Sequence, residues 1–401
     1  MTAVRPPPAP PPWADSLFSV GVTGTNGKTS TTAMIAALLG ELARPVARVT
    51  TLGAFLDEER QDVPAHYAGF LETLQRCLAR GGRYAALELT SEALALGFAK
   101  AWPCRVACFT NLSLDHSDAH GSPEHYLASK AQLFMALAPG GTAVLNGRDS
   151  AAQLLSEVIP PGVSVLTYGV PSRGEAWAPL DLAAHSLEVG FEGTHFELEP
   201  CVRFPELPLS LRIRAVGEIF VENALAALAA ALASGVPAAA AASALSRVAP
   251  PPGRFQVVRE RPYVVVDYAH TPDALSRTLA TARTLCDGQL CVVFGAGGQR
   301  DHAKRPLLGA AARAADRVIV TSDNPRHEDP QAIMAQIAEG LGDHADVRRE
   351  VDRARAIELA IRTAKPKDLL LIAGKGHELV QETAGVRIAF SDEAIVRSVQ
   401  I

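Results

Sequence analysis

Residues 21–32, GVTGTNGKTSTT, decide the fold, because they join an apolar run to the start of a helix through a glycine-containing loop. Glycines let backbone N–H groups face bound phosphates, and the helix N-terminus adds a partial positive charge. Lys28 supplies a point charge, and the hydroxyl of Thr29 or Ser30 can reach Mg²⁺. The loop has one residue fewer between its glycines than the common P-loop, so it indicates an ATP site without indicating a reaction. The residues predicted to hold ATP here are Gly24, Thr25, Asn26, Gly27, Lys28, Thr29 and Ser30.

Length, charge and cysteine content narrow the class of protein. A chain of 401 residues exceeds what one hydrophobic core usually serves, so we expect two domains with a cleft between them. The net charge of −5 and the scattered basic residues argue against nucleic acid or a membrane surface as partner and favour a small molecule. The six cysteines form no CxxC pair, which predicts reduced thiols and a cytoplasmic protein. We identify no membrane span or signal peptide.

Hydrophobic periodicity indicates an α/β fold. Strand-like and helix-like runs alternate from residue 18 to residue 145, which is typical of a parallel sheet with helices on both faces. Residues 165–215 read as short β-like pieces, expected to form a small appendage, and an alanine-rich helix follows. A second alternating block comes after Pro250–Gly253. We therefore expect a proline-rich tail over residues 1–17, extended or disordered, and two α/β domains over residues 18–250 and 251–401.

Three further residues stand near predicted strand ends or helices. Glu88 ends a predicted strand, His116 lies in the loop NLSLDH (111–116), and Lys130 lies in a predicted helix. Taken singly, His116 fits an ordinary loop histidine and Lys130 a solvated helix residue. Taken with the phosphate loop, they match a family pattern.

At this point the chain resembles the Mur ligase family, the ATP-dependent enzymes that join amino acids to the peptidoglycan peptide, and within it the ligases that add diaminopimelate. The resemblance extends from residue 18 to residue 400. It rests on GTNGKTS (24–30), ELTSE (88–92), TNLSLDHSDAHGSPEHY (110–126), Lys130, Asn223 in VENALAALAA, GRF (253–255), VVVDYAHTPDAL (264–275), FGAGGQRDHAKRP (294–306), SDNPRHEDP (322–330) and GKGHE (374–378). It implies a P-loop central ATP-binding domain followed by a Rossmann-like C-terminal domain that closes over it.

The resemblance also implies roles for the site residues. The family transfers the γ-phosphoryl group of ATP to a carboxylate, and an amine then displaces phosphate from the acyl phosphate. Lys28, Glu88, His116 and Lys130 are the residues implied in catalysis. Thr29 would hold one Mg²⁺, Glu88 and His116 a second, and Lys130 would carry a CO₂-derived carbamate beside it. Asn223 would contact the adenine, Asp267 the ribose and Arg254 the phosphates, and His270 is included in the nucleotide site.

The amino-acid pocket follows from the same resemblance. Arginine pairs with the distal carboxylate of a diamino diacid, and acidic side chains meet its distal ammonium group. The matching positions are Arg300, Asp323, Asn324, Arg326, Gly374 and Glu378.

The chain departs from the family pattern on the side that would hold the acyl acceptor. The N-terminal UDP-binding domain of the family is not recognised before the phosphate loop. The family's paired threonines are replaced near residues 64–66, its Ser-His pair by Ser91-Glu92, and the arginine that follows by Phe98. Phe220 replaces an asparagine of the adenine pocket. The chain thus retains the family's residues for ATP and for the amino acid, whereas the residues for the UDP-sugar differ.

These observations predict an ATP- and Mg²⁺-dependent amino-acid ligase that adds meso-diaminopimelate, or a similar diamino acid, to a muramoyl-dipeptide-like acceptor in peptidoglycan synthesis. One alternative is a ligase that acts on a peptide not linked to UDP, in recycling or specialised peptide synthesis. A second alternative is a non-catalytic nucleotide-binding member of a complex, with a separate UDP-binding or pathway protein as its partner.

Overall fold

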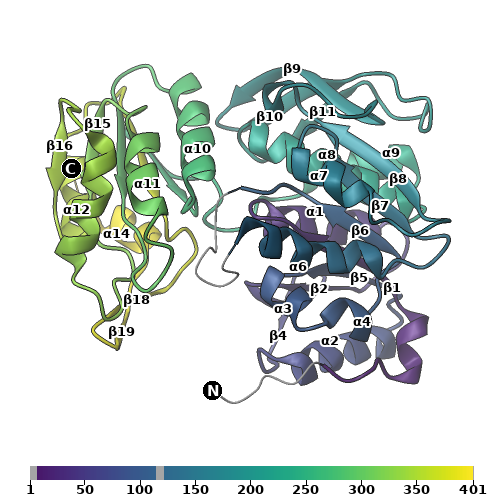
Figure 1. The fold of residues 1–401 in the computed structure, drawn as a ribbon. Coiled ribbons are helices and arrows are strands. Elements are labelled where there is room, and N and C mark those ends of the chain that lie inside the picture. The colour runs from purple at the N-terminus through teal and green to yellow at the C-terminus, as the bar shows by residue number, and fades with distance from the viewer. Residues whose placement is uncertain (1–6, 114–121, 401) are drawn as a thin grey trace.

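The computed structural model describes residues 7–113 and 122–400, which form two lobes side by side (Figure 1). The N-terminal lobe runs from β1 to α9 and is built on an eleven-stranded sheet; the C-terminal lobe runs from β12 to α14 and is built on a six-stranded sheet. The predicted α/β fold is confirmed. The domain boundary at residue 250 stays a prediction, and it falls between α9 and β12, where the chain passes from one sheet to the other.

The N-terminal sheet has the strand order β11-β10-β9-β8-β7-β6-β1-β5-β2-β3-β4. Its central strands, from β9 to β2, are parallel, and both edges are antiparallel. The strands are β1 (Phe18–Thr23), β2 (Val46–Thr50), β3 (Gly53–Leu56), β4 (Glu59–Gln61), β5 (Tyr84–Glu88), β6 (Val106–Phe109), β7 (Thr142–Asn146), β8 (Ser164–Gly169), β9 (Leu182–Gly190), β10 (Gly193–Leu198) and β11 (Ser210–Ile213). The helices are α1 (Lys28–Leu39), α2 (Tyr67–Ala79), α3 (Ser91–Ala95), α4 (Phe98–Ala101), α6 (Pro123–Met135), α7 (Ser150–Ser156), α8 (Glu218–Ala233) and α9 (Ala238–Arg247).

Helices cover both faces of this sheet. Val20 and Ala86 pack in one core with α1, α8 and α9, whereas Ala85 and Leu87 pack in a second core with α2, α6 and α7. Successive strand residues point to opposite faces, so a sheet covered on both sides needs apolar residues at every position. This is why the strands read as continuous apolar runs in the sequence.

Two expectations about the N-terminal lobe need correction. The β-like pieces of residues 165–215 are not a separate appendage, because β8 pairs in parallel with both β7 and β9 and the strands extend the central sheet. Within the tail, Pro12–Ser16 form a 3₁₀ helix (η1). Trp13 packs against Trp102, with 5.9 Å between ring centroids, and the hydroxyl of Tyr67 donates to the carbonyl of Pro8. Aromatic contacts that are distant in sequence therefore fix a segment whose composition favours disorder.

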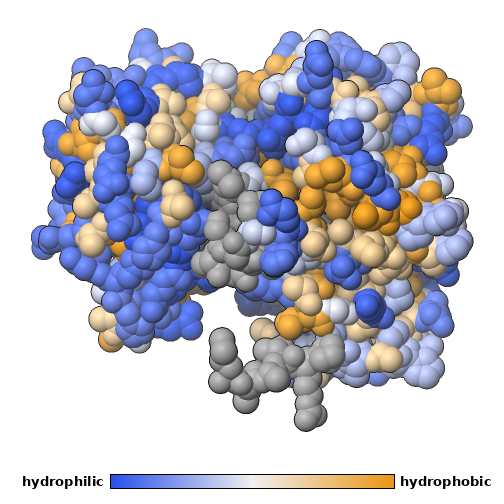
Figure 2. Space-filling view, in the orientation of Figure 1, coloured by the Kyte–Doolittle hydropathy of each residue, from blue (hydrophilic) through white to orange (hydrophobic). Residues whose placement is uncertain are grey.

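The C-terminal sheet has the order β12-β13-β17-β14-β15-β16, with only β12 antiparallel. The strands are β12 (Gln256–Glu260), β13 (Tyr263–Asp267), β14 (Leu290–Phe294), β15 (Arg317–Val320), β16 (Val347–Arg349) and β17 (Leu369–Ala373), and a separate hairpin consists of β18 (Val380–Thr383) and β19 (Val386–Ala389). The helices are α10 (Pro272–Thr284), α11 (Lys304–Ala312), α12 (Pro330–Leu341), α13 (Arg353–Thr363) and α14 (Asp392–Ser398). The viewed face of this lobe is mainly hydrophilic (Figure 2).

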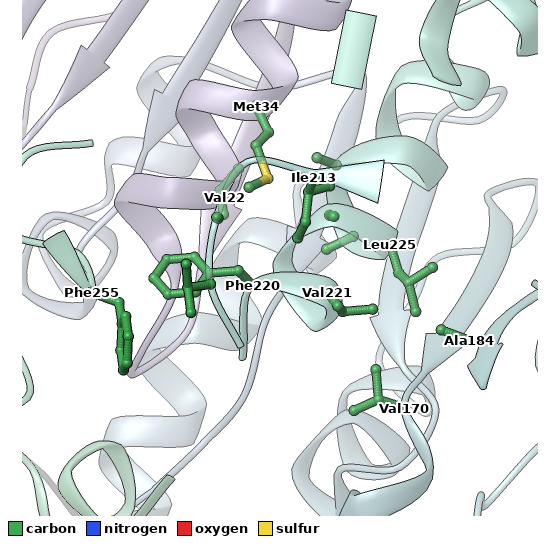
Figure 3. Packing of buried hydrophobic residues seen from close by; sticks show 14 of the residues in the cluster. Val22, Met34, Val170, Ala184, Ile213, Phe220, Val221, Leu225 and Phe255 are labelled. Atoms are coloured by element: carbon green, nitrogen blue, oxygen red, sulfur yellow. The ribbon is translucent and has the colours of Figure 1, made fainter. Parts of the chain in front are cut away.

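Side chains of the two lobes pack against each other. Phe220 of α8 and Phe255, just before β12, belong to one buried cluster (Figure 3). Phe191 stacks on Tyr263 with 3.7 Å between ring centroids. Among the described helices, none combines the length and apolar character needed to cross a bilayer.

Candidate active site

A cavity of about 350 Å³ lies between the lobes, where the phosphate loop faces the carboxyl ends of the C-terminal strands. Ligands of α/β sheets bind outside the carboxyl ends of parallel strands. Every predicted site residue that the structure describes lines this cavity: Gly24, Thr25, Asn26, Gly27, Lys28, Thr29, Ser30, Glu88, Lys130, Asn223, Arg254, Asp267, His270, Arg300, Asp323, Asn324, Arg326, Gly374 and Glu378. His116 falls in residues 114–121, outside the described part of the chain.

The phosphate loop connects β1 to α1 and is held from the end of β6. The backbone N–H of Asn26 donates to Oδ1 of Asn111 at 2.9 Å, and the hydroxyl of Thr110 donates to the carbonyl of Asn26 at 2.7 Å. Gly27 has φ +84°, and a Cβ there would collide with Oδ1 of Asn223. The loop therefore requires glycine at this position both for its backbone conformation and for the close approach of α8.

The carboxylate of Glu88 lies beside the first turn of α1. Glu88 ends β5, next to β1 in the sheet, and its Oε2 accepts a hydrogen bond from the hydroxyl of Thr29 at 2.9 Å. The backbone N–H of Thr51, which follows β2, donates to the same oxygen at 3.1 Å. A hydroxyl and a carboxylate side by side suit Mg²⁺, which takes few protein ligands and keeps waters and substrate phosphates. Within residues 7–113 and 122–400, no three His, Cys, Asp or Glu side chains are grouped as for a metal ion.

Lys130 is almost completely buried at the back of the phosphate loop. Its Nζ donates to the carbonyl of Gly24 at 2.8 Å and lies 4.1 Å from the centroid of the Tyr126 ring. This position contradicts the reading of Lys130 as a solvated helix residue. The Lys130 side chain thus contacts the phosphate loop at Gly24. Nζ of Lys28 donates to the carbonyl of Thr25, the next residue of that loop, at 2.8 Å.

A further part of the cavity wall, formed by α8 and the end of β13, holds the residues predicted to contact the base and the ribose. Asn223 lines the cavity, and its Nδ2 atom is buried with no hydrogen-bond partner among the described residues, so one donor of this amide is unsatisfied. Asp267 is 6% exposed and accepts from the backbone N–H groups of Phe255 and Ala269 at 2.6 and 2.7 Å. Burial raises the pKa of Asp267 despite these donors. Arg254 lies over the ring of Tyr268, at 4.3 Å.

The C-terminal lobe supplies a second polar cluster, at the carboxyl ends of β14, β15 and β17. Glu378 accepts from Nδ2 of Asn324 at 2.8 Å, and Gly374, at φ +110°, brings the backbone so near Asp323 that a Cβ would lie 2.8 Å from its Oδ2. Arg326 donates through Nη1 to the carbonyl of Gly298 at 2.5 Å. Carboxylates and a guanidinium group thus line one region of the cavity. Such a set can pair with a ligand that carries both ammonium and carboxylate groups.

Sequence reasoning missed several residues of the site. Thr51 could have been found from topology, because β2 pairs in parallel with β5 and must end beside Glu88. Tyr126 lies four residues before Lys130 on α6, a spacing that places both on one helix face. Lys304 and Thr278 also line the cavity but carry no signal of their own in the sequence.

Two protein-family models together match most of the chain. A model described as the Mur ligase middle domain matches residues 22–231, and one described as the Mur ligase, glutamate ligase domain matches residues 253–376.

Individual relatives agree with these models. The chain is 40% identical over 392 residues to a UDP-N-acetylmuramoyl-L-alanyl-D-glutamate–2,6-diaminopimelate ligase of Synechococcus elongatus, covering 96% of this chain and 76% of that protein. A ligase of the same name from Xanthomonas campestris is 41% identical over 393 residues, with coverages of 95% and 77%. A solved structure of a ligase of that name superposes with a TM-score of 0.64 at 35% identity, covering 96% of this chain and 78% of that one. The folylpolyglutamate synthase of Mycobacterium tuberculosis shares the fold, with a TM-score of 0.71 at 22% identity and coverages of 90% and 89%.

Proposed function

Since this chain belongs to the Mur ligase family of ATP-dependent ligases, we propose that it joins meso-diaminopimelate, or a similar diamino acid, to the γ-carboxylate of a muramoyl-dipeptide-like acceptor. The observation that carries the proposal is that the phosphate loop, Glu88 and the Asp323–Arg326 segment line one cavity. Nucleotide, acceptor carboxylate and amine must meet in one place for an amide to form.

The chain's own groups fit ATP and Mg²⁺, which the family uses. The unpartnered Nδ2 of Asn223 suits the adenine. The glycines of the loop let its backbone pack against Thr110 and Asn223 while lining the cavity, where backbone N–H groups can face phosphate oxygens. Thr29 and Glu88 would hold Mg²⁺, and the bound ion would offset the negative charge of the phosphates. We assign His116 to the metal site on the resemblance alone. A carbamate on Lys130 would replace a buried cation by an anion in the wall of the cavity that Glu88 also lines, as a second metal would require.

The proposed reaction has two balanced steps. An oxygen of the acceptor carboxylate takes the γ-phosphoryl group, which forms an acyl phosphate and releases ADP. The amine nitrogen then attacks the carbonyl carbon, phosphate leaves, and the nitrogen loses a proton. Residues of both lobes position these reactants, so we expect closure of the lobes to favour the reaction over hydrolysis of the acyl phosphate.

One observation favours the alternative of an acceptor that is not linked to UDP. Glu92 lines the acceptor side of the cavity, beside Ser91, and its side chain is exposed. Phe98 does not line the cavity; it packs on Phe70, with ring centroids 5.2 Å apart. A carboxylate at this wall repels a polyanionic acceptor and suits one that carries an ammonium group, such as a peptide with a free amino terminus.

Phosphate release from ATP and Mg²⁺ with meso-diaminopimelate tests the proposal, with UDP-N-acetylmuramoyl-L-alanyl-D-glutamate and free L-alanyl-D-glutamate compared as acceptors. Turnover with the UDP-linked acceptor supports a role in peptidoglycan synthesis. Equal or better turnover with the free dipeptide, together with improved use of the UDP-linked acceptor by Glu92→Gln, supports the alternative. Absence of diaminopimelate-dependent phosphate release with either acceptor would contradict both.

A further inference from the structure

We propose that Lys375 is a positioning residue for the amine side of the site: it holds Glu378 and Asn324 so that one oxygen of the Glu378 carboxylate faces the incoming amino acid. This inference rests on the proposed function, because it assigns the Glu378 carboxylate to an amine substrate. Lys375 does not itself line the cavity, whereas Glu378 and Asn324 do.

Lys375 points into the protein directly after β17. Its side chain is 0% exposed, and glycines with positive φ stand on both sides, Gly374 at +110° and Gly376 at +51°. Side chains other than glycine are strained in this conformation. The chain therefore adopts an irregular backbone around a buried lysine, and such a cation needs its charge and its hydrogen bonds satisfied.

Three acceptors surround the ammonium group. Nζ donates to Oε2 of Glu378 at 2.9 Å, to Oδ1 of Asn324 at 3.1 Å and to the carbonyl of Val380 at 2.9 Å. An ammonium group has three hydrogens, so these contacts use its full donor capacity. The lysine thus joins the turn after β17, the loop after β15 and the start of β18.

The same contacts fix the orientation of the Asn324 amide. Its Oδ1 receives both the Lys375 ammonium and the backbone N–H of Glu382, at 3.0 Å. Two donors at one end of the amide hold the oxygen there, so Nδ2 must point the other way. It donates to Oε2 of Glu378 at 2.8 Å.

Glu378 is consequently held through one oxygen only. Oε2 accepts from both Lys375 and Asn324, and no hydrogen bond from the described residues reaches Oε1. The carboxylate is 33% exposed and lines the cavity. Oε1 is therefore the oxygen available to an ammonium group of the substrate.

The positive charge of Lys375 is a second reason why it holds Glu378 in place. Oδ1 of Asp323 lies 4.0 Å from Nζ of Lys375, so one cation stands between two carboxylates that both line the cavity. Without it, the two acidic groups would repel each other, and Glu378 would turn away from its present position. Loss of Lys375 should therefore weaken binding of the amine substrate selectively.

Lys375→Met in the chain of 401 residues tests this inference, with steady-state KM measured separately for diaminopimelate and ATP. We expect KM for diaminopimelate to rise about tenfold or more, while KM for ATP changes by less than about twofold. Arg317→Met is the matched control, because Arg317 pairs with Asp346 at 3.0 Å at the start of β15, away from the cavity. If Lys375→Met does not fold, Lys375→Gln is measured against the same criteria.

A double-mutant cycle with Glu378→Gln separates positioning from general support of the fold. If Lys375 acts through Glu378, the effects of the two substitutions on the KM for diaminopimelate are not additive. Additive effects, or equal rises in both KM values, would overturn the inference. The wild-type chain is assayed first. If it uses another amine in place of diaminopimelate, the proposed substrate is wrong and the cycle is run with that amine.

Discussion

Arg277, on α10 of the C-terminal lobe, donates a hydrogen bond of 2.6 Å to Oε2 of Glu222, which is 2% exposed on α8 of the N-terminal lobe. Arg173 donates to the other oxygen of the same carboxylate at 2.9 Å. Burial opposes ionisation of Glu222, but the two arginines together lower its pKa. Because Glu222 precedes Asn223, this ion pair ties the nucleotide side of the cavity to the position of the C-terminal lobe.

We expect Arg277→Met to destabilise the protein by about 3 kcal/mol, the low end of the cost of breaking a buried ion pair, because Arg173 and Asn146 still donate to the Glu222 carboxylate. KM for ATP should rise as well, since the contact joins the lobes beside Asn223. Urea denaturation and ATP titration check both effects. Arg283→Met on the same helix is the control: its ion pair with Asp316 is exposed, and exposed pairs contribute about 0–1 kcal/mol. Equal effects of the two substitutions would contradict the assignment.

The Arg305–Glu328 pair predicts a dependence of stability on pH. Arg305 is 1% exposed and donates to both oxygens of Glu328, at 2.9 and 3.0 Å, and these hydrogen bonds lower the pKa of Glu328 from 4.5 to about 2. Because the pKa of Glu328 is lower in the folded than in the unfolded protein, its ionised carboxylate stabilises the fold. This contribution to the free energy of unfolding is complete above about pH 4.5 and is lost as the pH falls through about 2. Urea denaturation at several pH values should show a smaller loss of stability below pH 4.5 in Glu328→Gln than in the wild type. Glu339→Gln, at an exposed position of α12, should follow the wild type.

Lys130→Ala tests the proposed carbamate. We expect ligation to be lost, and a small added carboxylate such as acetate or formate to restore part of it by occupying the space that the buried side chain leaves. Phosphate release with and without the added acid is the measurement. Lys28→Ala is the control and should not be rescued, because its ammonium group is expected to act as a cation. Full activity of Lys130→Ala would exclude the carbamate.

Arg326→Ala should weaken diaminopimelate binding by about 2–4 kcal/mol, the cost of removing one partner from a desolvated charge pair. KM for ATP should change little, because we assign Arg326 to the amino-acid substrate and not to the nucleotide. Arg387→Ala is a suitable control, since Arg387 lies on the nearby β19 and is 72% exposed. Comparable losses for both substrates would mean that the Arg326 side chain supports the structure, through its hydrogen bond of 2.5 Å to the carbonyl of Gly298.

Local patterns in the sequence were sufficient to predict the alternating strands and helices, the phosphate loop and its place before α1. These features depend on side-chain periodicity and on glycine at positions such as Gly27, which act over a few residues. The roles implied by the resemblance, from Lys28 to Glu378, remain predictions, although every described member lines one cavity.

Only the tertiary structure decided which of these groups meet. Thr51 reaches Glu88 because β2 lies beside β5, and residues 165–215 extend the central sheet because β8 pairs with β7 and β9. Lys375 reads in the sequence as one lysine between two glycines, and its three acceptors come together only when β15, β17 and β18 are in place. Hydrogen bonds and burial depend on contacts between residues far apart in the chain, and these contacts exist only after folding brings the strands together.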